Sequence, residues 1–303
     1  MSTVATISAE WFKPHERTYV AGFQSFAVNI GIAAGLVMSP AFLSMSGGNW
    51  RAAMALCSVV AVVGIILALI TQFGPRPVIS APAAEEAENK KLFSPEFRKA
   101  LVQTTFYVLL IAFFFDCWVQ QAWLDLGTPY YAADKPLGLG LGPMGAGSRL
   151  AFASLAMMAG GLAAPVIVEK LFKGKPAPAI FLGYAVSALS LIWMRFLTPE
   201  NGILLTLVPC LILFFSSFVN PTVVGYISKV YPHGITGRIN GLIQGLGIFG
   251  AVVGVGIGAG LLSAFKSFFP GMTAMTTVVC VGAIVILFLK PPRGFNVEKV
   301  RHS

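Results

Sequence analysis

Asp116 lies inside a long apolar run and is the first residue of the chain that could carry out chemistry within a membrane. It follows the segment ALVQTTFYVLLIAFFF, Gln120 comes four residues later on the same face of a helix, and Gln121 is next to it. An acidic side chain inside a bilayer costs about 2.5–3.5 kcal/mol on insertion scales, and such residues usually belong to a substrate, ion or proton pathway. These three residues therefore indicate a solute or proton site.

The expected depth of Asp116 leaves a second interpretation open. A helix rises about 1.5 Å per residue, which places Asp116 about 25 Å beyond Lys99. The hydrocarbon core of a bilayer is about 30 Å thick, so Asp116 would lie close to its outer edge. A solvated carboxylate in an outer vestibule, with no role in transport, is the alternative.

Other polar residues inside apolar runs are spaced four apart, on one face of a helix. They are Ser25 with Asn29, Ser216 with Asn220, and Asn240 with Gln244. Each pair could line a polar cavity, and each could instead join neighbouring helices through hydrogen bonds. Arg149, near the outer end of its run, is also a pathway candidate, and its alternative role is to snorkel towards the lipid headgroups.

No nucleotide-binding or hydrolytic motif accompanies these residues. The sequence contains no Walker A motif, GxSxG or HExxH, so an ATP-driven pump or a hydrolase is not indicated. The four cysteines and three histidines lack the spacing of a metal site or of a disulfide framework. We expect no cofactor, no metal and no enzymatic activity. An intramembrane enzyme, the less favoured alternative, would need a cluster of catalytic groups at bilayer depth.

The composition requires that the elements positioning these residues lie in a membrane. Of 303 residues, 56% are hydrophobic and only 11% are charged, and the mean hydropathy is +0.79. Such a chain has too little polar surface to cover a soluble globule of this size. The net charge of +9 comes from short basic clusters between apolar runs, an arrangement that orients membrane proteins, so nucleic acid is not an expected partner.

A helix that spans a bilayer needs about 20 mostly apolar residues, and the sequence contains eight such runs. They cover residues 18–44, 50–73, 99–123, 148–169, 177–197, 202–223, 238–264 and 271–290. We therefore predict an all-α polytopic membrane bundle of eight transmembrane helices.

The basic residues predict the orientation of these helices. If both termini are cytoplasmic, only five of the 21 Lys and Arg residues fall on the outer side: Arg51, Lys135, Arg149, Arg195 and Lys266. This asymmetry is what the positive-inside rule requires. We expect an integral protein of the plasma membrane with both termini in the cytoplasm.

Residues 14–35 and 232–254 carry nearly the same pattern. With Gly22 set against Gly241, Gly31 falls opposite Gly250 and Gly35 opposite Gly254. The two copies introduce the first and seventh apolar runs, so the repeat has a period of six helices and both copies enter the membrane from the same side. Two parallel six-helix halves form a known transporter architecture. The first run would then be the fifth helix of its half, and we expect four helices to precede it.

The motifs around these runs resemble those of the major facilitator superfamily. WFKPHERTYVAG, followed by NIG and then GGNWRAAM, resembles the loop between the fourth and fifth helices and the start of the sixth helix of that family. The resemblance implies a partial N-terminal half at residues 1–74, a cytoplasmic linker at 75–98 and a complete C-terminal half at 99–303. It also implies that the first four helices of the family lie outside this chain.

The same resemblance implies a function. The whole protein would be a secondary active transporter that moves a small solute by rocker-switch alternating access, driven by a gradient of the solute, of protons or of another ion. Its partners would be the solute, the lipid bilayer and a chain supplying the four missing helices, and the 303-residue chain alone would not transport. A non-transporting remnant or an interaction subunit of a split transporter is the alternative.

The family also carries a basic loop signature, whose second-half counterpart would be GGLAAPVIVEKLFKGK. Glu169 and Lys170 occupy its acidic and basic positions and are candidates for a conformational latch. The glycine spacing and the aspartate of the signature are absent. An ordinary cytoplasmic loop with positive charges is the alternative.

Small residues recur every four positions in two runs. Gly250, Gly254 and Gly258 form one ridge, and Gly31 and Gly35 belong to another, with Ala27 and Ser39. Such ridges let helix backbones approach closely in lipid, so we predict that these glycines pack against neighbouring helices.

The loops supply two further expectations. Ser94 and Pro95 are typical of an N-cap and the first position of a helix. Residues 124–147 are glycine-rich, and we expect them to form a long outer loop, with nearby aromatic residues in an interfacial belt. These aromatic residues are Trp118, Trp123, Tyr130 and Tyr131.

Overall fold

The structure, a computed structural model, describes residues 17–71, 94–231 and 233–295, and the side chains among them except those of 17–28, 71 and 233–234. These residues form helices and no strand. The chain divides into two compact units, unit 1 (Met1–Ala87) and unit 2 (Glu88–Ser303). We describe each unit by itself.

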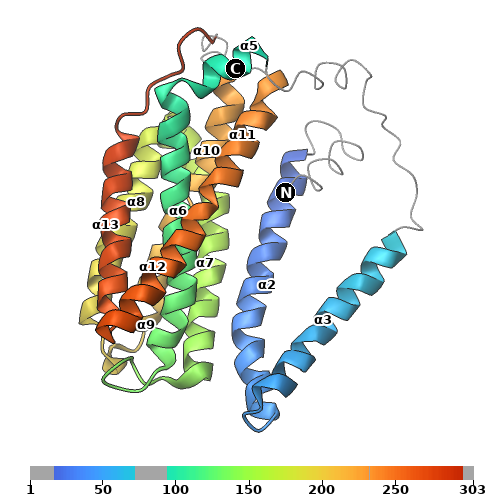
Figure 1. Cartoon of the computed structure of the whole chain (residues 1–303), viewed down its shortest axis with the longest axis vertical. Coiled ribbons are helices and arrows are strands. Elements are labelled where there is room, and N and C mark those ends of the chain that lie inside the picture. The colour runs from blue at the N-terminus through green and yellow to red at the C-terminus, as the bar shows by residue number, and fades with distance from the viewer. Residues whose placement is uncertain (1–16, 72–93, 232, 296–303) are drawn as a thin grey trace. The chain divides into compact units, whose positions relative to one another are not determined.

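Unit 1 contains two helices, α2 (Arg17–Met45) and α3 (Trp50–Thr71), joined by a tight turn (Figure 1). Gly47 and Gly48 have φ angles of +63° and +83°, which glycine adopts without steric cost. The side chain of Asn49 then caps α3, because its Oδ1 accepts a hydrogen bond from the backbone N–H of Arg51 at 3.1 Å.

Unit 2 contains nine α-helices among its described residues, and most of them run side by side along one bundle (Figure 1). They are α5 (Pro95–Leu101), α6 (Thr104–Ala132), α7 (Gly142–Lys170), α8 (Pro176–Trp193), α9 (Leu204–Ser216), α10 (Val219–Val230), α11 (His233–Gly247), α12 (Phe249–Phe265) and α13 (Phe269–Ile286). Two single-turn helices, η1 (Met194–Phe196) and η2 (Pro199–Asn201), connect α8 to α9.

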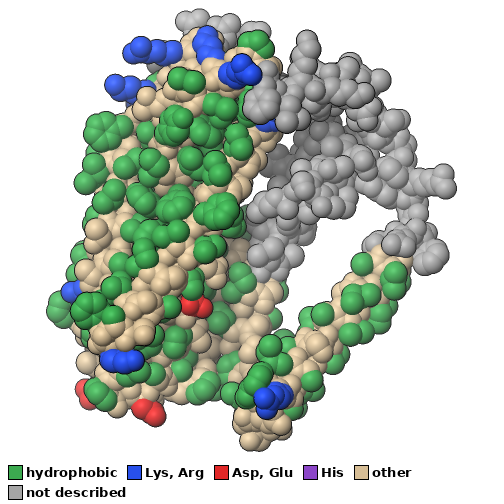
Figure 2. All heavy atoms as spheres, viewed as in Figure 1, with side chains coloured by type: hydrophobic (Ala, Val, Ile, Leu, Met, Phe, Trp, Pro, Cys, Tyr) green, Lys and Arg blue, Asp and Glu red, His purple; other side chains and the backbone are tan. Residues whose placement is uncertain are grey.

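The described helices confirm a polytopic membrane bundle. Seven are long and apolar enough to cross a bilayer, when α9 with α10 and α11 with α12 are each taken as one span. They match the second to eighth predicted runs in order. The first run is α2, and its part with described side chains, Asn29–Met45, is apolar but shorter than a span. Figure 2 shows hydrophobic side chains over the lateral surface of unit 2, as expected where lipid covers it.

The predicted boundaries of the third helix are wrong. The expected helix 99–123 is replaced by the short α5, a break at residues 102–103, and α6, which continues to Ala132. The outer loop is therefore 133–141 rather than 124–147. Trp123, Tyr130 and Tyr131 are at most 3% exposed and pack inside the bundle instead of forming an interfacial belt.

The N-terminal cap of α5 is confirmed. The backbone N–H of Phe97 donates to the Ser94 hydroxyl at 3.2 Å, and Pro95 is the first residue of the helix. The residues that follow α13 are joined to the start of α6, since the Thr105 hydroxyl donates to the Lys290 carbonyl at 2.7 Å. These bonds hold one end of unit 2 together.

Two of the predicted spans are interrupted. Between α9 and α10, the Ser217 hydroxyl donates to the Phe214 carbonyl at 2.7 Å and so competes with the helical backbone. Pro221 has no N–H to donate to the carbonyl of Ser217, four residues earlier. Between α11 and α12, the break at Ile248 lies among glycines, which weaken a helix.

The glycine ridge of the seventh run lies on α12. Gly250, Gly254 and Gly258 are buried, and α12 packs along α6 at these positions. A Cβ at Gly250 would collide with the carbonyl oxygen of Phe114, and one at Gly254 would lie 2.5 Å from Cδ1 of Trp118. The close approach of α6 and α12 therefore requires glycine.

Candidate functional site

Asp116 lies near the middle of α6, 12 residues after Thr104 and 16 before Ala132. It is 2% exposed, and the side-chain amide of Gln120 donates to its Oδ1 at 2.8 Å. Asp116 therefore lies near the middle of its helix and not near its outer end, because α6 starts later and ends later than the apolar run suggested. Asp116 and Gln120 form a polar pair inside the bundle.

The surroundings of Asp116 are closed by neighbouring helices. One turn before it, the carbonyl of Ala112 accepts a hydrogen bond from the hydroxyl of Tyr184 on α8. The ring of Tyr184 in turn lies against Gly282 of α13, where a Cβ would be only 2.9 Å from the ring. The polar pair is thus enclosed where α6, α8 and α13 meet.

Gln121 does not join this pair, because it lies on a different face of α6. It is exposed in unit 2, and so is Asp125, one turn further along the same face. Asp125 makes no hydrogen bond or ion pair with any residue that the structure describes. The two side chains form a polar stripe on the exposed side of α6, and we call Gln121 and Asp125 the α6 stripe.

Sequence analysis missed Asp125 because it ended the third run at Trp123. A signal for the longer helix is present in the sequence. The buried residues Trp123, Leu126, Tyr130 and Tyr131 recur at spacings of three, four and one, which is the period of a helix. That period would have placed Asp125 inside a span.

Arg149 lies at a similar depth to Asp125. The N–H of Leu141 donates to the carbonyl of Tyr131 at 3.0 Å, so α6 ends where α7 begins. At 1.5 Å per residue, Asp125 and Arg149 each lie about 10 Å inside that end. Nη1 of Arg149 donates to the carbonyl of Gly145 at 3.1 Å, towards the start of α7, as a snorkelling side chain would.

The polar residues of α10 and α11 are joined across the two helices rather than along them. The amide of Gln244 donates to Oδ1 of Asn220 at 2.9 Å. The Ser216 hydroxyl donates to the carbonyl of Leu213 and not to Asn220. Oδ1 of Asn240, one turn before Gln244, is buried and has no hydrogen-bond partner among the described residues.

The candidates of unit 1 are described only in part. The side chain of Ser25 lies outside the described residues, and Asn29 is buried. A Cβ at Gly31 or Gly35 would meet no described atom within 4 Å. Packing at these two glycines stays a prediction.

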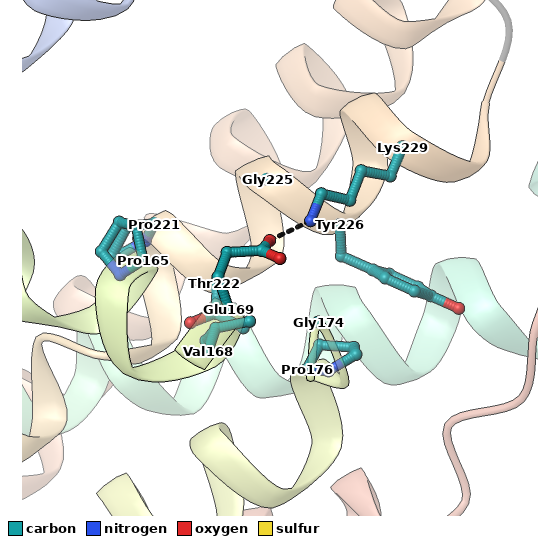
Figure 3. A pocket seen from close by; sticks show the side chains of 10 residues that line it. All are labelled: Pro165, Val168, Glu169, Gly174, Pro176, Pro221, Thr222, Gly225, Tyr226 and Lys229. Carbon is teal, nitrogen blue, oxygen red and sulfur yellow. Dashed lines mark hydrogen bonds and ion pairs between the residues drawn. The ribbon is translucent and has the colours of Figure 1, made fainter. Parts of the chain in front are cut away.

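Glu169, a latch candidate, forms an ion pair at the end of α7. Its partner is Lys229 at the end of α10, and not its neighbour Lys170, which is exposed (Figure 3). Sequence analysis missed Lys229, because no pattern in the sequence indicates that these two helix ends meet. The ion pair borders a small hollow, which we consider separately below.

The family model of the Major Facilitator Superfamily matches residues 1–247. No curated protein matches the chain. The matched residues include both the Asp116 pair and the α6 stripe.

Proposed function

The chain belongs to the Major Facilitator Superfamily, a family of membrane transporters, and on that premise we propose that, together with a chain supplying four further helices, it moves a small solute by rocker-switch alternating access. The transport would be secondary, driven by a gradient of the solute, protons or another ion. Two opposed bundles would expose a central pathway first to one side of the membrane and then to the other. Helices with polar residues at bilayer depth would line that pathway.

The observation that carries this proposal is the α6 stripe. Asp125 is an exposed, unpaired carboxylate within a span whose other exposed residues are mostly apolar. A charge facing lipid at this depth is costly, so such residues face protein or water-filled cavities. We infer that the stripe lines the outer part of the pathway and that Asp125 meets a cationic group of the solute or a coupling cation.

The buried pair of Asp116 and Gln120 is suited to proton coupling rather than to solute contact. Asp116 is 2% exposed, and its one hydrogen bond is to the Gln120 amide. A carboxyl group in such a place can alternate between a protonated and an ionised form as the surrounding bundle opens and closes. We assign it the role of proton carrier.

The bonded residues Asn220 and Gln244, with Asn240 beside them, would supply neutral ligands for the solute. The buried Oδ1 of Asn240 has no described partner, so it could accept a hydrogen bond from a solute donor. The breaks near Ser217 and Ile248 lie close to these side chains in the chain. Interrupted helices next to polar groups are typical of transport sites.

We also propose the plasma membrane as the location, with both termini in the cytoplasm. Figure 2 shows Lys and Arg side chains gathered at the end of unit 2 that holds α5. In this orientation the ion pair of Glu169 and Lys229 lies at the cytoplasmic ends of α7 and α10 and acts as a latch.

The substitution Asp125→Asn tests the proposed role of the α6 stripe in cells that make the protein. The solute is first identified by a screen of small molecules, as the molecule that the cells take up only when they carry the gene. We expect at least a tenfold loss of its uptake in the variant, because a carboxylate contact to a cation is lost. Asp134→Asn, in the outer loop, removes the same charge outside α6 and should leave uptake unchanged. Equal uptake in the two variants contradicts the role of the stripe.

A further inference from the structure

A hollow opens between the ends of α7, α8 and α10, away from the Asp116 pair and the α6 stripe. It is shown in Figure 3, and its cavity volume is about 60 Å³. Its lining includes Pro165 and Glu169 of α7, Pro176 of α8, and Thr222 and Lys229 of α10. We call it the α7–α10 hollow. A cavity of this size can hold one compact polar group, such as a phosphate, but not a whole solute.

The charges around the α7–α10 hollow are predominantly positive. Lys229 faces Glu169 across it, and both side chains are partly exposed. The segment that closes the hollow, from the end of α7 to the start of α8, adds three exposed lysines: Lys170, Lys173 and Lys175. One lysine and one glutamate therefore line the hollow, and three further lysines in the adjoining segment give this end of the bundle a positive surplus that attracts an anion.

A buried polar group within the lining has no partner. Thr222 is 4% exposed, and its hydroxyl makes no hydrogen bond with a described residue. A helical threonine commonly donates to a carbonyl in the preceding turn, but this one does not. The hydroxyl therefore has a proton to donate to an oxygen atom of a ligand in the hollow.

The backbone of the lining offers few N–H groups to such a ligand. Pro165, Pro176 and Pro221 all line the hollow, and proline has no N–H to donate. Gly174, with φ of +74°, brings the loop close to the carboxylate of Glu169, where a Cβ would lie 3.5 Å from Oε2. Side chains, rather than main-chain amides, must therefore hold the ligand.

An apolar stripe leads along α7 into the hollow. Leu162 and Val166 are more than half exposed and lie on the same helical face as Glu169. In a membrane this face is covered by acyl chains. A ligand that is anionic at one end and apolar at the other would match both the stripe and the lysines.

We propose that the α7–α10 hollow binds the phosphate headgroup of an anionic phospholipid, with the acyl chains along Leu162 and Val166. In the proposed orientation the hollow opens to the cytoplasmic leaflet, which is the anionic one. The phosphate bonds Lys229 and accepts from the Thr222 hydroxyl. It competes with Glu169 for the same ammonium group, so lipid binding and the ion pair oppose one another.

This competition gives two substitutions opposite effects. Lys229→Gln removes the phosphate ligand and should weaken lipid retention about fivefold, because one lysine near an anionic surface contributes about 1 kcal/mol. Glu169→Gln breaks the same ion pair but removes the competitor, so it should strengthen retention. If the ion pair only held the helices together, both variants would change retention in the same direction. Thr222→Val, which keeps the shape of the side chain, should weaken it.

The experiment uses the full chain in vesicles of phosphatidylcholine that contain a minor fraction of photoactivatable phosphatidylglycerol. Crosslinked peptides show where the probe binds. We expect labelling at the ends of α7 and α10, competition by unlabelled phosphatidylglycerol, and the opposite shifts described above. Lys290→Gln, which removes a lysine that does not line the hollow, should leave the labelling at the hollow unchanged.

A parallel arm distinguishes a lipid from a free phosphate. Inorganic phosphate is added to the chain in phosphatidylcholine vesicles, and the labelling is repeated. The proposal is supported if inorganic phosphate displaces the probe only at concentrations far above that of the lipid. Any one of three results overturns the proposal. Inorganic phosphate abolishes the labelling at a concentration equal to that of the lipid, Lys229→Gln leaves the labelling unchanged, or the labelling spreads evenly over unit 2. None of these outcomes depends on whether the chain transports a solute.

Discussion

Two acidic residues of α6 lie in different surroundings although they are nine positions apart. Asp116 is enclosed and bonded to Gln120, whereas Asp125 is exposed and unpaired. The first cannot meet a solute without a rearrangement of the bundle, and the second can. We therefore assign proton coupling and cation contact to separate residues, which makes the two roles separable by substitution.

Asp116→Asn tests the proton-carrier role. The substituted amide keeps the size of the side chain and can still accept the hydrogen bond of Gln120, so we expect folding to be retained. Uptake driven by a proton gradient should fall at least tenfold, because no group at this depth then gains and loses a proton. Exchange of labelled for unlabelled solute at equal pH should continue. Loss of both activities, in a variant that folds, contradicts a role limited to coupling.

At the residue scale the sequence indicated which side chains are polar and paired along one helix, but not which side chains meet across two helices. Asp116 and Gln120 were predicted as a pair and are bonded. The bond between Asn220 and Gln244 was not predicted, because it joins two helices whose rotation the sequence does not specify. Spacing along one helix predicts neighbours on that helix, and contacts between helices depend on packing.

At the scale of elements, glycine determines how closely helices approach. The ridge of α12 was predicted from its spacing alone and contacts α6. Gly160 and Gly183 were not predicted, yet a Cβ at Gly183 would lie 2.6 Å from the carbonyl oxygen of Phe215. Isolated glycines of this kind carry no periodic signal, so sequence analysis cannot distinguish them from exposed ones.

Gly250→Ala tests the ridge. The added methyl group would collide with the carbonyl oxygen of Phe114, and a backbone atom cannot rotate away. We expect a loss of about 1–3 kcal/mol in the free energy of unfolding, measured by thermal or chemical denaturation in detergent. Gly256→Ala in the same helix meets no atom within 4 Å and should be neutral or stabilise by up to about 1 kcal/mol. Equal stabilities of the two variants would show that α6 and α12 are not in close contact.

The boundaries of α6 show why element limits are hard to predict in membrane proteins. The segment LDLGTPYY contains an acid, a glycine and a proline, which together are typical of a loop. In the structure Asp125 lies on the exposed face, Gly127 packs against the ring of Trp123, and Pro129 lies in the last turn. Each residue is tolerated because of its position on the helix, which composition does not reveal.

At the scale of the whole molecule, the class of protein follows from the apolar runs, and the described helices and the family match confirm it. The order of the spans was predicted correctly from the second run onward. The interruptions near Ser217 and Ile248 were not, because both lie within continuous apolar sequence. The proposed transport cycle rests on motion of whole bundles, and these interruptions are places where α9 to α12 can bend.

Alternating access is the central claim, and thiol labelling tests it most directly. With the four native cysteines replaced, Gln121→Cys reports on the outer part of the pathway and Gly241→Cys on the inner part of α11, with Ile284→Cys on α13 as an exposed apolar control. The measurement is the rate of reaction with a charged, membrane-impermeant thiol reagent in oriented membranes, before and after solute is added. We predict that the outer and inner rates change in opposite directions and that the control stays unreactive. Rates that change together, or that do not exceed the control, would contradict the account.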